Sequence, residues 1–515
     1  MKRLAIALSF GVGLLSLSQE ILWVRLVSFG HNGRPHAFAI VLAAFLVGIA
    51  LGAAVGRQLC GRSPNLLRSA GIVLAQAAFV DLAWVYLSAR VLGYTEARLP
   101  GLVGLIALTA MLKAIIFPIV HHLGSDASLE HRIGRSVSRV YLANVLGAAI
   151  GPIVTGYWLL DLMGVAAAMA LIGTLTAALS AICLVRAAPR HEWLVALAIA
   201  GTGVASVLQP PQIIETLAMA REEGGSLRHV IQNKHGIIHV LAGDGRFGDT
   251  TFGGNVYDGA ISTDLRTNMN GLDRAYLMAT MHPAPRRVLV IGLSTGAWTR
   301  VVLGMPGVER VDAVEINPGY VDLIERYPAV APILSDPRVR IHVDDGRRWM
   351  RAHIDRRYDL IFQNTTFHWR AYSTMLLSEE YLRLTARLLA PGGILAVNTT
   401  GSADAYRTAL EVFPHVARYA SFAYMSQQPL VKRADAEAVL RRCRIGDEPA
   451  FADDLFERGR VGDRLARAPL EPAAEYLRAS ARYAPTVITD MNLLPEFRRG
   501  EPPLFGLLDE WLPRQ

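Results

Sequence analysis

The sequence is poor in cysteine, and its few cysteines are not placed for joint chemistry. The three of them, Cys60, Cys183 and Cys443, lie far apart along the 515 residues and show no spacing typical of metal ligands. We therefore predict neither a disulfide framework nor a zinc site, and no other bound metal.

The sequence also lacks two features that would assign a compartment or a partner. No cleavage site of small residues follows the first apolar stretch, and more apolar stretches come after it, so we predict no cleaved signal peptide. The formal net charge of +8 does not indicate nucleic-acid binding, because arginines that flank membrane helices explain it equally well. We predict no nucleic-acid partner.

What the chain does have is a long apolar region. Residues 1–210 are dominated by apolar runs, whereas the rest has the composition of a soluble protein. Stretches of about 20 apolar residues can cross a bilayer as helices. The sequence therefore predicts an α-helical transmembrane bundle of about seven spans. These spans are 4–29, 37–56, 70–92, 102–120, 137–160, 165–185 and 193–208.

Glycines at four-residue spacing occur in the second and fifth of these spans. Gly48, Gly52 and Gly56 share one helix face, and Gly147 and Gly151 share another. Small residues placed in this way let two helices approach backbone to backbone. We predict that all five serve tight packing of the bundle.

Ionisable residues also fall within the predicted spans. A charge buried in a membrane is costly, so such groups usually face the bundle interior and pair with one another. We predict the pairs Glu20–Lys113 and Asp81–Arg25. Two roles fit such pairs equally well: a polar pocket for a substrate headgroup or a translocation path, and polar contacts that hold helices together.

The soluble half divides into two predicted parts. Residues 211–282 form a linker and a small β subdomain, in which turn residues separate strands at 228–233, 236–241 and 251–257. Residues 283–515 follow as a Rossmann-like α/β domain with a C-terminal extension.

The α/β domain begins with a strand, a glycine turn and a helix. The apolar run 288–291 is typical of a strand buried on both faces, Gly292 and Gly296 bracket a tight turn, and a second buried strand at 311–316 carries Glu315 near its end. This order is typical of the nucleotide-binding half of a Rossmann-like sheet, where the glycines let the backbone approach the ligand and the carboxylate binds ribose hydroxyls. The turn itself does not match the dinucleotide fingerprint.

Strands and helices continue to alternate after Glu315, which predicts a mostly parallel sheet. Ligand groups gather at the carboxyl ends of the strands in such a sheet, and Gly292, Glu315, Asp345 and Asn364 all fall at these ends. The later predicted strands are 339–343, 358–363 and 394–398, and the predicted helices are 297–303, 320–327, 347–353 and 378–389.

Several motifs of this half together carry a resemblance to a known family. They are Tyr257-Asp258-Gly259, Val290 through Gly296, Val314-Glu315-Ile316-Asn317, Asp344-Asp345-Gly346, Tyr358-Asp359-Leu360-Ile361 and Thr489-Asp490-Met491-Asn492. With these motifs the chain resembles the spermidine synthase family of aminopropyltransferases, which share the fold of S-adenosylmethionine-dependent methyltransferases. The apolar half looks like that of the membrane-fused bacterial members.

The resemblance implies roles for individual residues. Glu315 would hold the ribose and Asp345 the adenine amine of S-adenosylmethionine or of its decarboxylated form. The cofactor-binding residues implied in this way are Gly292, Ser294, Gly296, Glu315, Asp345 and Gly346, and the substrate-binding residues are Tyr257, Asp258, Asp273 and Tyr276.

The chain departs from the family where the catalytic loop begins. The family's catalytic strand ends in Asp, whereas this chain has Asn364 followed by Thr365-Thr366. An amide is no general base near neutral pH, and a cationic polyamine finds no carboxylate in this loop. Arg370 can instead clamp a carboxylate and His368 can move a proton. The predicted catalytic residues are Asn364, His368, Arg370 and Tyr372.

We therefore predict a membrane-bound enzyme that acts on S-adenosylmethionine or a close analogue, by methyl transfer, alkyl transfer or acceptor-free cleavage of the sulfonium. The loss of the loop carboxylates predicts that it does not make spermidine from putrescine. Two alternatives stay open: a true polyamine aminopropyltransferase, and a transporter or sensor whose soluble domain binds a nucleoside. The predicted partners are a small-molecule substrate and the lipid bilayer, and the chain can form a homo-oligomer.

The arginines between the spans bear on the orientation in the membrane. By the positive-inside rule their loops and the N-terminus lie in the cytoplasm, and seven spans then place the soluble half outside. Because adenosyl donors are made in the cytosol, we predict instead a protein of the bacterial inner membrane whose soluble half faces the cytoplasm. The arginines concerned are Arg57, Arg62, Arg68, Arg132, Arg135, Arg139, Arg186 and Arg190.

Overall fold

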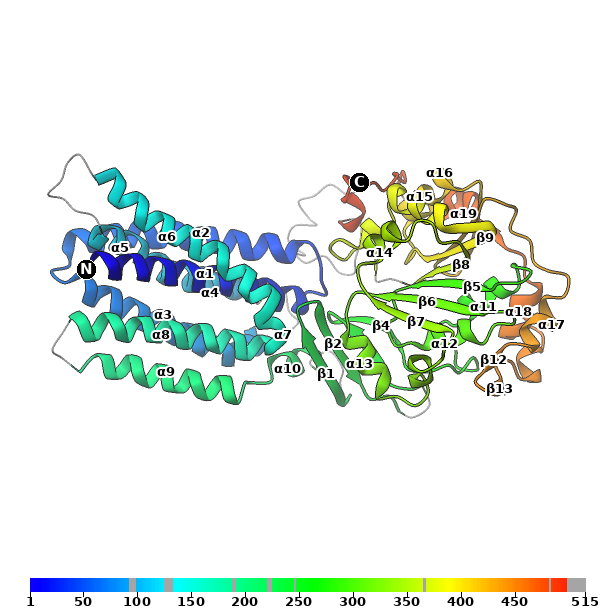
Figure 1. The fold of residues 1–515 in the computed structure, drawn as a ribbon, viewed down its shortest axis with the longest axis horizontal. Helices are drawn as coiled ribbons and strands as arrows, with labels where there is room; N and C mark the ends of the chain where they lie inside the picture. Colours follow the sequence, from blue (N-terminus) through cyan, green and yellow to red (C-terminus); the bar gives the residue numbers. More distant parts are fainter. Residues whose placement is uncertain are drawn as a thin grey trace. The chain divides into compact units, whose positions relative to one another are not determined.

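The structure, a computed structural model, divides into two units, Met1–Ile237 and Ile238–Gln515 (Figure 1). It describes residues 1–91, 99–124, 133–187, 191–219, 225–244, 247–364, 367–480 and 483–497. Four residues named above, Arg132, Arg190, Thr365 and Thr366, lie outside these ranges.

The first unit is built of long apolar helices. Among the described residues, six helices are long and apolar enough to cross a membrane, and α9 with α10 would make a seventh if this pair, bent by 57°, is one span. The bend falls at Pro210-Pro211, where a helix cannot continue. The helices are α1 (Lys2–Gly30), α2 (His36–Arg62), α3 (Leu66–Val91), α4 (Leu99–Ala114), α5 (Ile116–Gly124), α6 (Ile133–Val154), α7 (Leu160–Leu162), α8 (Val165–Ala187), α9 (Trp193–Leu208) and α10 (Ile213–Met219).

The spaced glycines pack helices together, as predicted. A methyl group on Gly52 of α2 would lie 2.3 Å from the carbonyl oxygen of Met111 in α4, and one on Gly147 of α6 would lie 2.1 Å from that of Phe10 in α1. Gly48, Gly56 and Gly151 meet backbone oxygens at similarly short distances. No larger side chain fits at these crossings, because the helix backbones are in contact.

The ion pairing inside the bundle differs from the prediction. Lys113 lies 2.8 Å from Asp81, the Gln19 amide donates to the other Asp81 oxygen at 2.7 Å, and all three side chains are at most 2% exposed. The predicted pairs Glu20–Lys113 and Asp81–Arg25 are wrong. Successive helix residues point about 100° apart, so Gln19 faces the interior and its neighbour Glu20 does not.

Arg25 has a different role in the first unit. Its guanidinium donates to the backbone oxygens of Asn233 and Lys234, and the Lys234 amine lies 2.8 Å from Asp161 in α7. The last residues of this unit, which include strand β1 (Leu227–Asn233), are therefore held at the bundle end where α1 and α7 end.

The second unit begins with a small antiparallel sheet, β2 (Gly236–Leu241), β3 (Thr250–Gly253) and β4 (Val256–Ala260). The single strand predicted at 251–257 is wrong, because the chain turns back at Gly254-Asn255. Both residues have positive φ, +57° and +68°, as the tight turn of a hairpin requires. Asp258 and Gly259 lie within β4.

The larger sheet carries the parallel strands predicted from the alternating pattern. Its eight strands have the order β14-β10-β11-β9-β8-β5-β6-β7, and the five from β9 to β7 are parallel. The antiparallel strands β10, β11 and β14 extend it at one edge and were not predicted. The strands are β5 (Arg287–Ile291), β6 (Arg310–Glu315), β7 (Val339–Val343), β8 (Tyr358–Gln363), β9 (Leu389–Asn398), β10 (His415–Tyr419), β11 (Phe422–Ser426) and β14 (Glu471–Pro472).

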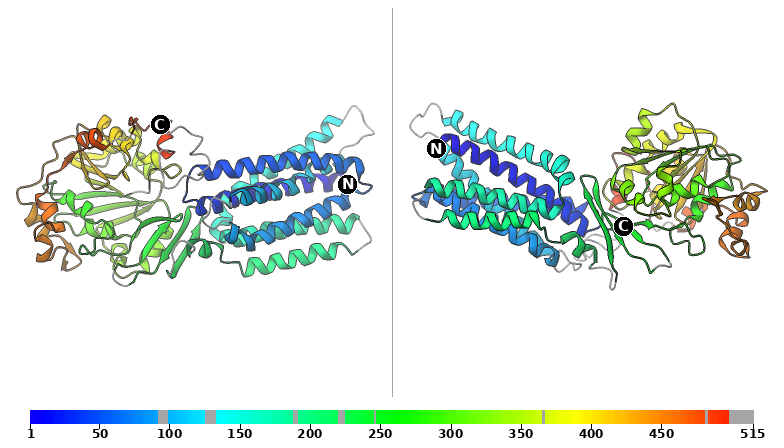
Figure 2. Two further views of the ribbon diagram at one scale, coloured as in Figure 1. Left: turned by 180° about the vertical axis from the view of Figure 1, so that it is seen from behind. Right: turned by 60° about the horizontal axis from the view of Figure 1, so that its bottom comes forward.

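Helices cover both faces of this sheet (Figures 1 and 2). On one face, Trp349, Tyr381 and Tyr406 of α14, α15 and α16 form a core with the sheet residues Leu289 and Ile361. The helices of this unit are α11 (Asp273–Ala279), α12 (Ala297–Leu303), α13 (Gly319–Glu325), α14 (Gly346–Ala352), α15 (Glu379–Leu388), α16 (Ala403–Val412), α17 (Ala436–Arg441), α18 (Val461–Arg467) and α19 (Ala473–Ser480), with β12 (Arg444–Ile445) and β13 (Glu448–Pro449) as a separate pair. The unit is thus a mixed α/β domain.

Candidate active site

The site lies at the carboxyl ends of the parallel strands. β8, β5, β6 and β7 are neighbours in this order, so the residues that follow them meet at one edge of the sheet. The structure therefore brings together Asn364 after β8, Gly292 after β5, Glu315 at the end of β6 and Asp345 after β7.

Glu315 is fixed by the glycine turn. One carboxylate oxygen accepts hydrogen bonds from the backbone amides of Leu293 at 2.8 Å and Ser294 at 3.3 Å, and the other accepts from Asn317 at 2.9 Å. The turn reaches this shape because Gly292 has φ +86°, and a methyl group there would lie 3.2 Å from the carbonyl oxygen of Asn364. A carboxylate has about four acceptor sites, so Glu315 can still accept from a ribose hydroxyl.

The Glu315 carboxyl is nearly fully buried, with 5% exposure. Burial raises its pKa to about 7, the charge of Asp258 adds to the increase, and the hydrogen bonds from Asn317 and Leu293 oppose it. Its charge therefore changes near neutral pH.

We expect donor binding to strengthen as the pH rises through about 7, because the ionised Glu315 accepts the ribose hydroxyls and attracts a sulfonium. Calorimetric titration with an adenosyl sulfonium measures the affinity at pH values on either side of the Glu315 pKa. We expect the affinity one pH unit above this pKa to be about tenfold higher than the affinity one unit below it. Glu315→Gln should bind more weakly and with no pH dependence in this range. A wild-type-like pH profile in Glu315→Gln would remove the assignment.

Asp258 brings a second carboxylate to this place from the small sheet. The Tyr320 hydroxyl, in the first turn of α13, donates to its Oδ2, and the Ser294 hydroxyl donates to its backbone oxygen at 2.7 Å. Burial raises the pKa of Asp258, whereas the hydrogen bond from Tyr320 and the charge of Arg370 lower it. The sequence predicted no carboxylate in the catalytic loop and named Asp258 as a substrate-binding residue; the structure places Asp258 in β4, with its carboxylate held by Tyr320.

The loop after β8 is held by the last residue of β9 and by a residue that follows it. The Asn364 Oδ1 accepts from the Asn398 amide at 3.1 Å, and the His368 Nδ1 lies 2.7 Å from the Thr400 hydroxyl. His368 is 8% exposed, whereas Tyr372 is 71% exposed. Of the four predicted catalytic residues, Tyr372 is therefore the one whose side chain is turned to solvent.

Arg370 lies over the turn between β3 and β4. A methyl group on Gly254 would be 2.5 Å from its Nη2, and one on Gly253 would be 2.5 Å from the Tyr320 hydroxyl and 3.5 Å from Asp258 Oδ2. Two glycines in succession therefore leave room for the phenol, the carboxylate and the guanidinium.

Other predicted substrate-binding residues have structural partners. The Asp273 carboxylate accepts from the Tyr419 hydroxyl at 2.7 Å, Tyr276 packs on Phe451 with ring centroids 4.9 Å apart, and the exposed Tyr257 donates to the Met269 carbonyl at 3.2 Å. Asp345, predicted to bind adenine, accepts from the Arg348 backbone amide at 2.8 Å and so caps α14. Gly346 begins the same helix, and Gly296 precedes α12.

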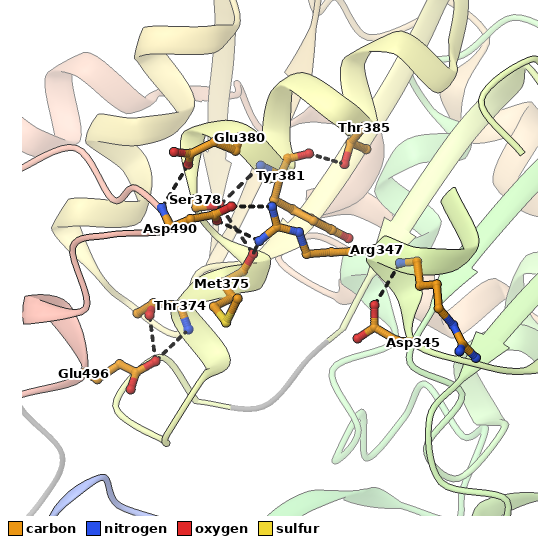
Figure 3. A network of polar contacts seen from close by, with 11 residues as sticks. Asp345, Arg347, Thr374, Met375, Ser378, Glu380, Tyr381, Thr385, Asp490 and Glu496 are labelled. Carbon is orange, nitrogen blue, oxygen red and sulfur yellow. Dashed lines mark hydrogen bonds and ion pairs between the residues drawn. The ribbon is translucent and has the colours of Figure 1, made fainter. Parts of the chain in front are cut away.

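A polar network fastens the C-terminal segment to the residues after the catalytic loop (Figure 3). Asp490 accepts two hydrogen bonds from Arg347 at 2.7 Å each and one from the Ser378 hydroxyl at 2.7 Å. Glu496, 4% exposed, accepts from the Thr374 hydroxyl at 2.7 Å. Asp490, from the motif Thr489-Asp490, thus holds Ser378, at the end of the loop that carries Arg370.

We expect Asp490→Asn to lower the free energy of unfolding by about 2 kcal/mol, because it leaves the buried Arg347 without its bidentate partner. The hydrogen bond from Arg347 holds the pKa of Asp490 below its ordinary 3.8. The stability that the ionised Asp490 contributes is therefore fully present above pH 3.8 and is lost as the pH falls through the lowered pKa. Denaturant unfolding at neutral and acid pH measures both effects. Equal stability of Asp490→Asn and the wild type at neutral pH would contradict them.

Sequence reasoning missed Tyr320, the Gly253-Gly254 pair and Thr400. Tyr320 was within reach, since it follows β6 at the same edge of the sheet as Glu315. The glycine pair carried no such signal, because it was placed inside a strand. Among the described residues, no group of three or more His, Cys, Asp or Glu side chains could hold a metal.

Comparison with known proteins relates most of the second unit to one family. Residues 275–421 match the family of the Spermine/spermidine synthase domain. Polyamine aminopropyltransferase 2 of Streptomyces coelicolor is 30% identical over 291 residues, which are 53% of this chain and 50% of that protein. The chain thus matches only half the length of this relative. The polyamine aminopropyltransferase of Mycobacterium tuberculosis is 26% identical over 411 residues, 74% of each chain. The matched 74% of this chain is longer than the second unit, Ile238–Gln515, so the match extends into the first, apolar unit.

Solved structures give a more distant likeness. The spermidine synthase from Thermotoga maritima has a TM-score of 0.37 at 17% identity, over 47% of this chain and 84% of that one. Human methyltransferase-like protein 13, in complex with SAH, has a TM-score of 0.28 at 21% identity, over 36% of this chain and 94% of that one.

The sheet order defines a mixed α/β domain in which Gly292, Glu315, Asp345 and Asn364 lie at the carboxyl ends of the parallel strands. More narrowly, the chain carries a spermidine-synthase-like domain. The resemblance inferred from the motifs is confirmed.

Proposed function

We propose that the second unit transfers an aminopropyl group from decarboxylated S-adenosylmethionine to an amine. The observation that carries this proposal is the position of the Asp258 carboxylate. It accepts a hydrogen bond from the Tyr320 hydroxyl, and it is close enough to Glu315 for its charge to raise the pKa of that carboxyl. It gives an amine the counter-charge and proton acceptor that Asn364 cannot give. The aminopropyltransferase relatives favour this reading over methyl transfer or acceptor-free cleavage.

The residues present fit an adenosyl sulfonium. Glu315 would accept from the ribose, the backbone of Gly292–Gly296 would lie against the nucleoside, and Asp345 would face the adenine. When bound, this donor supplies a carbon already activated by the positive sulfur. The charges of Glu315 and Asp258 attract that sulfonium to the site.

The transfer requires one proton to leave the acceptor before the carbon–nitrogen bond forms. Asp258 would accept it from the ammonium group, directly or through water, and Tyr320 would hold the carboxylate in place. The neutral nitrogen then attacks the carbon next to sulfur, the carbon–sulfur bond breaks, and sulfur keeps the electron pair as a neutral thioether. The positive charge passes to the new secondary amine.

The test is an assay of the purified full chain in detergent with decarboxylated S-adenosylmethionine and a panel of amines. We expect methylthioadenosine and an aminopropylated product in equal amounts by mass spectrometry. Intact S-adenosylmethionine serves as the control donor. Thioether release without an aminopropylated product, or transfer from the intact donor alone, would reject this function.

The side of the membrane decides whether the donor can reach the site. Arg25 and Asp161, at the ends of α1 and α7, both hold Lys234, so residue 234 lies at the bundle end opposite the N-terminus. We propose that the second unit faces the cytoplasm, where the donor is made, with the N-terminus outside and against the arginine distribution.

We expect a reporter fused after Gln515 to be active only if it functions in the cytoplasm, and a reporter at Met1 to give the opposite result. Paired cytoplasmic and periplasmic reporters at both sites measure the orientation. Activity of the periplasmic reporter at the C-terminal fusion would show the opposite topology. The second unit would then have no access to a cytosolic donor.

A further inference from the structure

Arg370 places a positive charge where an amine acceptor must approach Asp258. Its guanidinium lies over Gly254, and the adjoining Gly253 lies under the Tyr320 hydroxyl and the Asp258 carboxylate. The two glycines are neighbours in the chain, so the Asp258 carboxylate and the Arg370 guanidinium lie against adjoining residues of the hairpin β3–β4. The charge of Arg370 acts on both Asp258 and Tyr320.

A diamine suits such a pair of charges poorly. One ammonium can lie against the Asp258 carboxylate, but the second brings another positive charge into a partly buried place that already holds the Arg370 guanidinium. Like charges a few ångströms apart at low effective dielectric repel strongly. A carboxylate in that second position would instead accept a bidentate hydrogen bond from the guanidinium.

We infer that the acceptor is an amine that also carries a carboxylate: Asp258 binds its amino end, and Arg370 binds its acid end. Arg370 is then a specificity-determining residue, with Gly254 providing its space. This inference rests on the proposed aminopropyl transfer and names the acceptor class for it. The nitrogen that attacks and the bond that breaks are those already described.

A matched pair of acceptors tests the inference. Putrescine and γ-aminobutyrate have the same carbon chain and differ in one terminal group, ammonium or carboxylate. With the purified full chain and decarboxylated S-adenosylmethionine, we expect kcat/KM for γ-aminobutyrate to exceed that for putrescine by at least about tenfold. Arg370→Met should lower the value for γ-aminobutyrate and raise that for putrescine, which inverts the preference.

Two further variants separate charge from folding. Arg370→Lys keeps the charge without the bidentate fork and should keep the direction of the preference at a lower rate. Arg383→Met removes an arginine from the exposed pair with Glu379 and should leave the acceptor ratio unchanged. The ratio of the two kcat/KM values in the wild-type protein tests the inference without any variant. The inference can therefore fail even if Arg370→Met does not fold.

The outcomes keep this inference apart from the proposed function. Transfer to putrescine in preference to γ-aminobutyrate, or an unchanged ratio in folded Arg370→Met, would overturn the acceptor class and leave aminopropyl transfer standing. Transfer to neither amine, with donor binding intact by calorimetry, would overturn the function itself.

Discussion

Asp258→Asn is expected to reduce kcat/KM for the amine acceptor by about 10² to 10⁴, the usual worth of a positioned proton acceptor. The substitution keeps the shape of the side chain and the hydrogen bond from Tyr320 while it removes both the charge and the basicity. Because Asn364 already fills the family's catalytic position, no other carboxylate in the catalytic loop can compensate. Steady-state rates with saturating donor measure the effect.

Two controls show whether the loss is chemical. Tyr320→Phe removes the hydrogen bond to Asp258 but leaves the carboxylate, and we expect a smaller loss, with an altered dependence of kcat on pH. Asn364→Asp restores the family's residue and should recover part of the activity in the Asp258→Asn background. Near-wild-type turnover by Asp258→Asn would mean that this carboxylate is structural and that the proposed mechanism is wrong.

Lys113→Met is expected to destabilise the first unit by about 3–5 kcal/mol, because it leaves the buried Asp81 side chain without the Lys113 amine that lies 2.8 Å from it. Asp81 is 1% exposed, so no solvent can replace the lost ammonium. Unfolding of the full chain in mixed micelles with increasing dodecyl sulfate, followed by helical circular dichroism, measures the effect.

The double variant Lys113→Met with Asp81→Asn distinguishes the two roles left open for this pair. If the pair only holds α3 and α4 together, removing both charges should restore most of the stability and leave transfer activity unchanged. Restored stability with lost activity would instead assign the pair a function in the first unit. A Lys113→Met variant as stable as the wild type would show that the charges are not buried as the structure has them.

The sequence by itself determined the parts of this protein that depend on local pattern. The apolar runs located the helices of the first unit, since a span needs only length and hydrophobicity. The glycines spaced by four residues identified the helix faces that touch other backbones. The position of Glu315 near the end of a buried strand placed it at the carboxyl edge of the sheet, because parallel strands end together. The hairpin at Gly254-Asn255 was missed because its β-forming residues continue on both sides of the turn.

Only the tertiary structure decided which distant groups meet. Asp258 receives its hydrogen bond from Tyr320, 62 positions away, and Lys113 finds Asp81 rather than Glu20. Local periodicity gives the face of an element but not the element that packs on it, so the sequence named Asp258 as a candidate without showing that Tyr320 holds its carboxylate. The proposed proton acceptor, Asp258, lies on the small sheet, and the charge balance around it depends on how β4, α13 and the loop of Arg370 pack against one another.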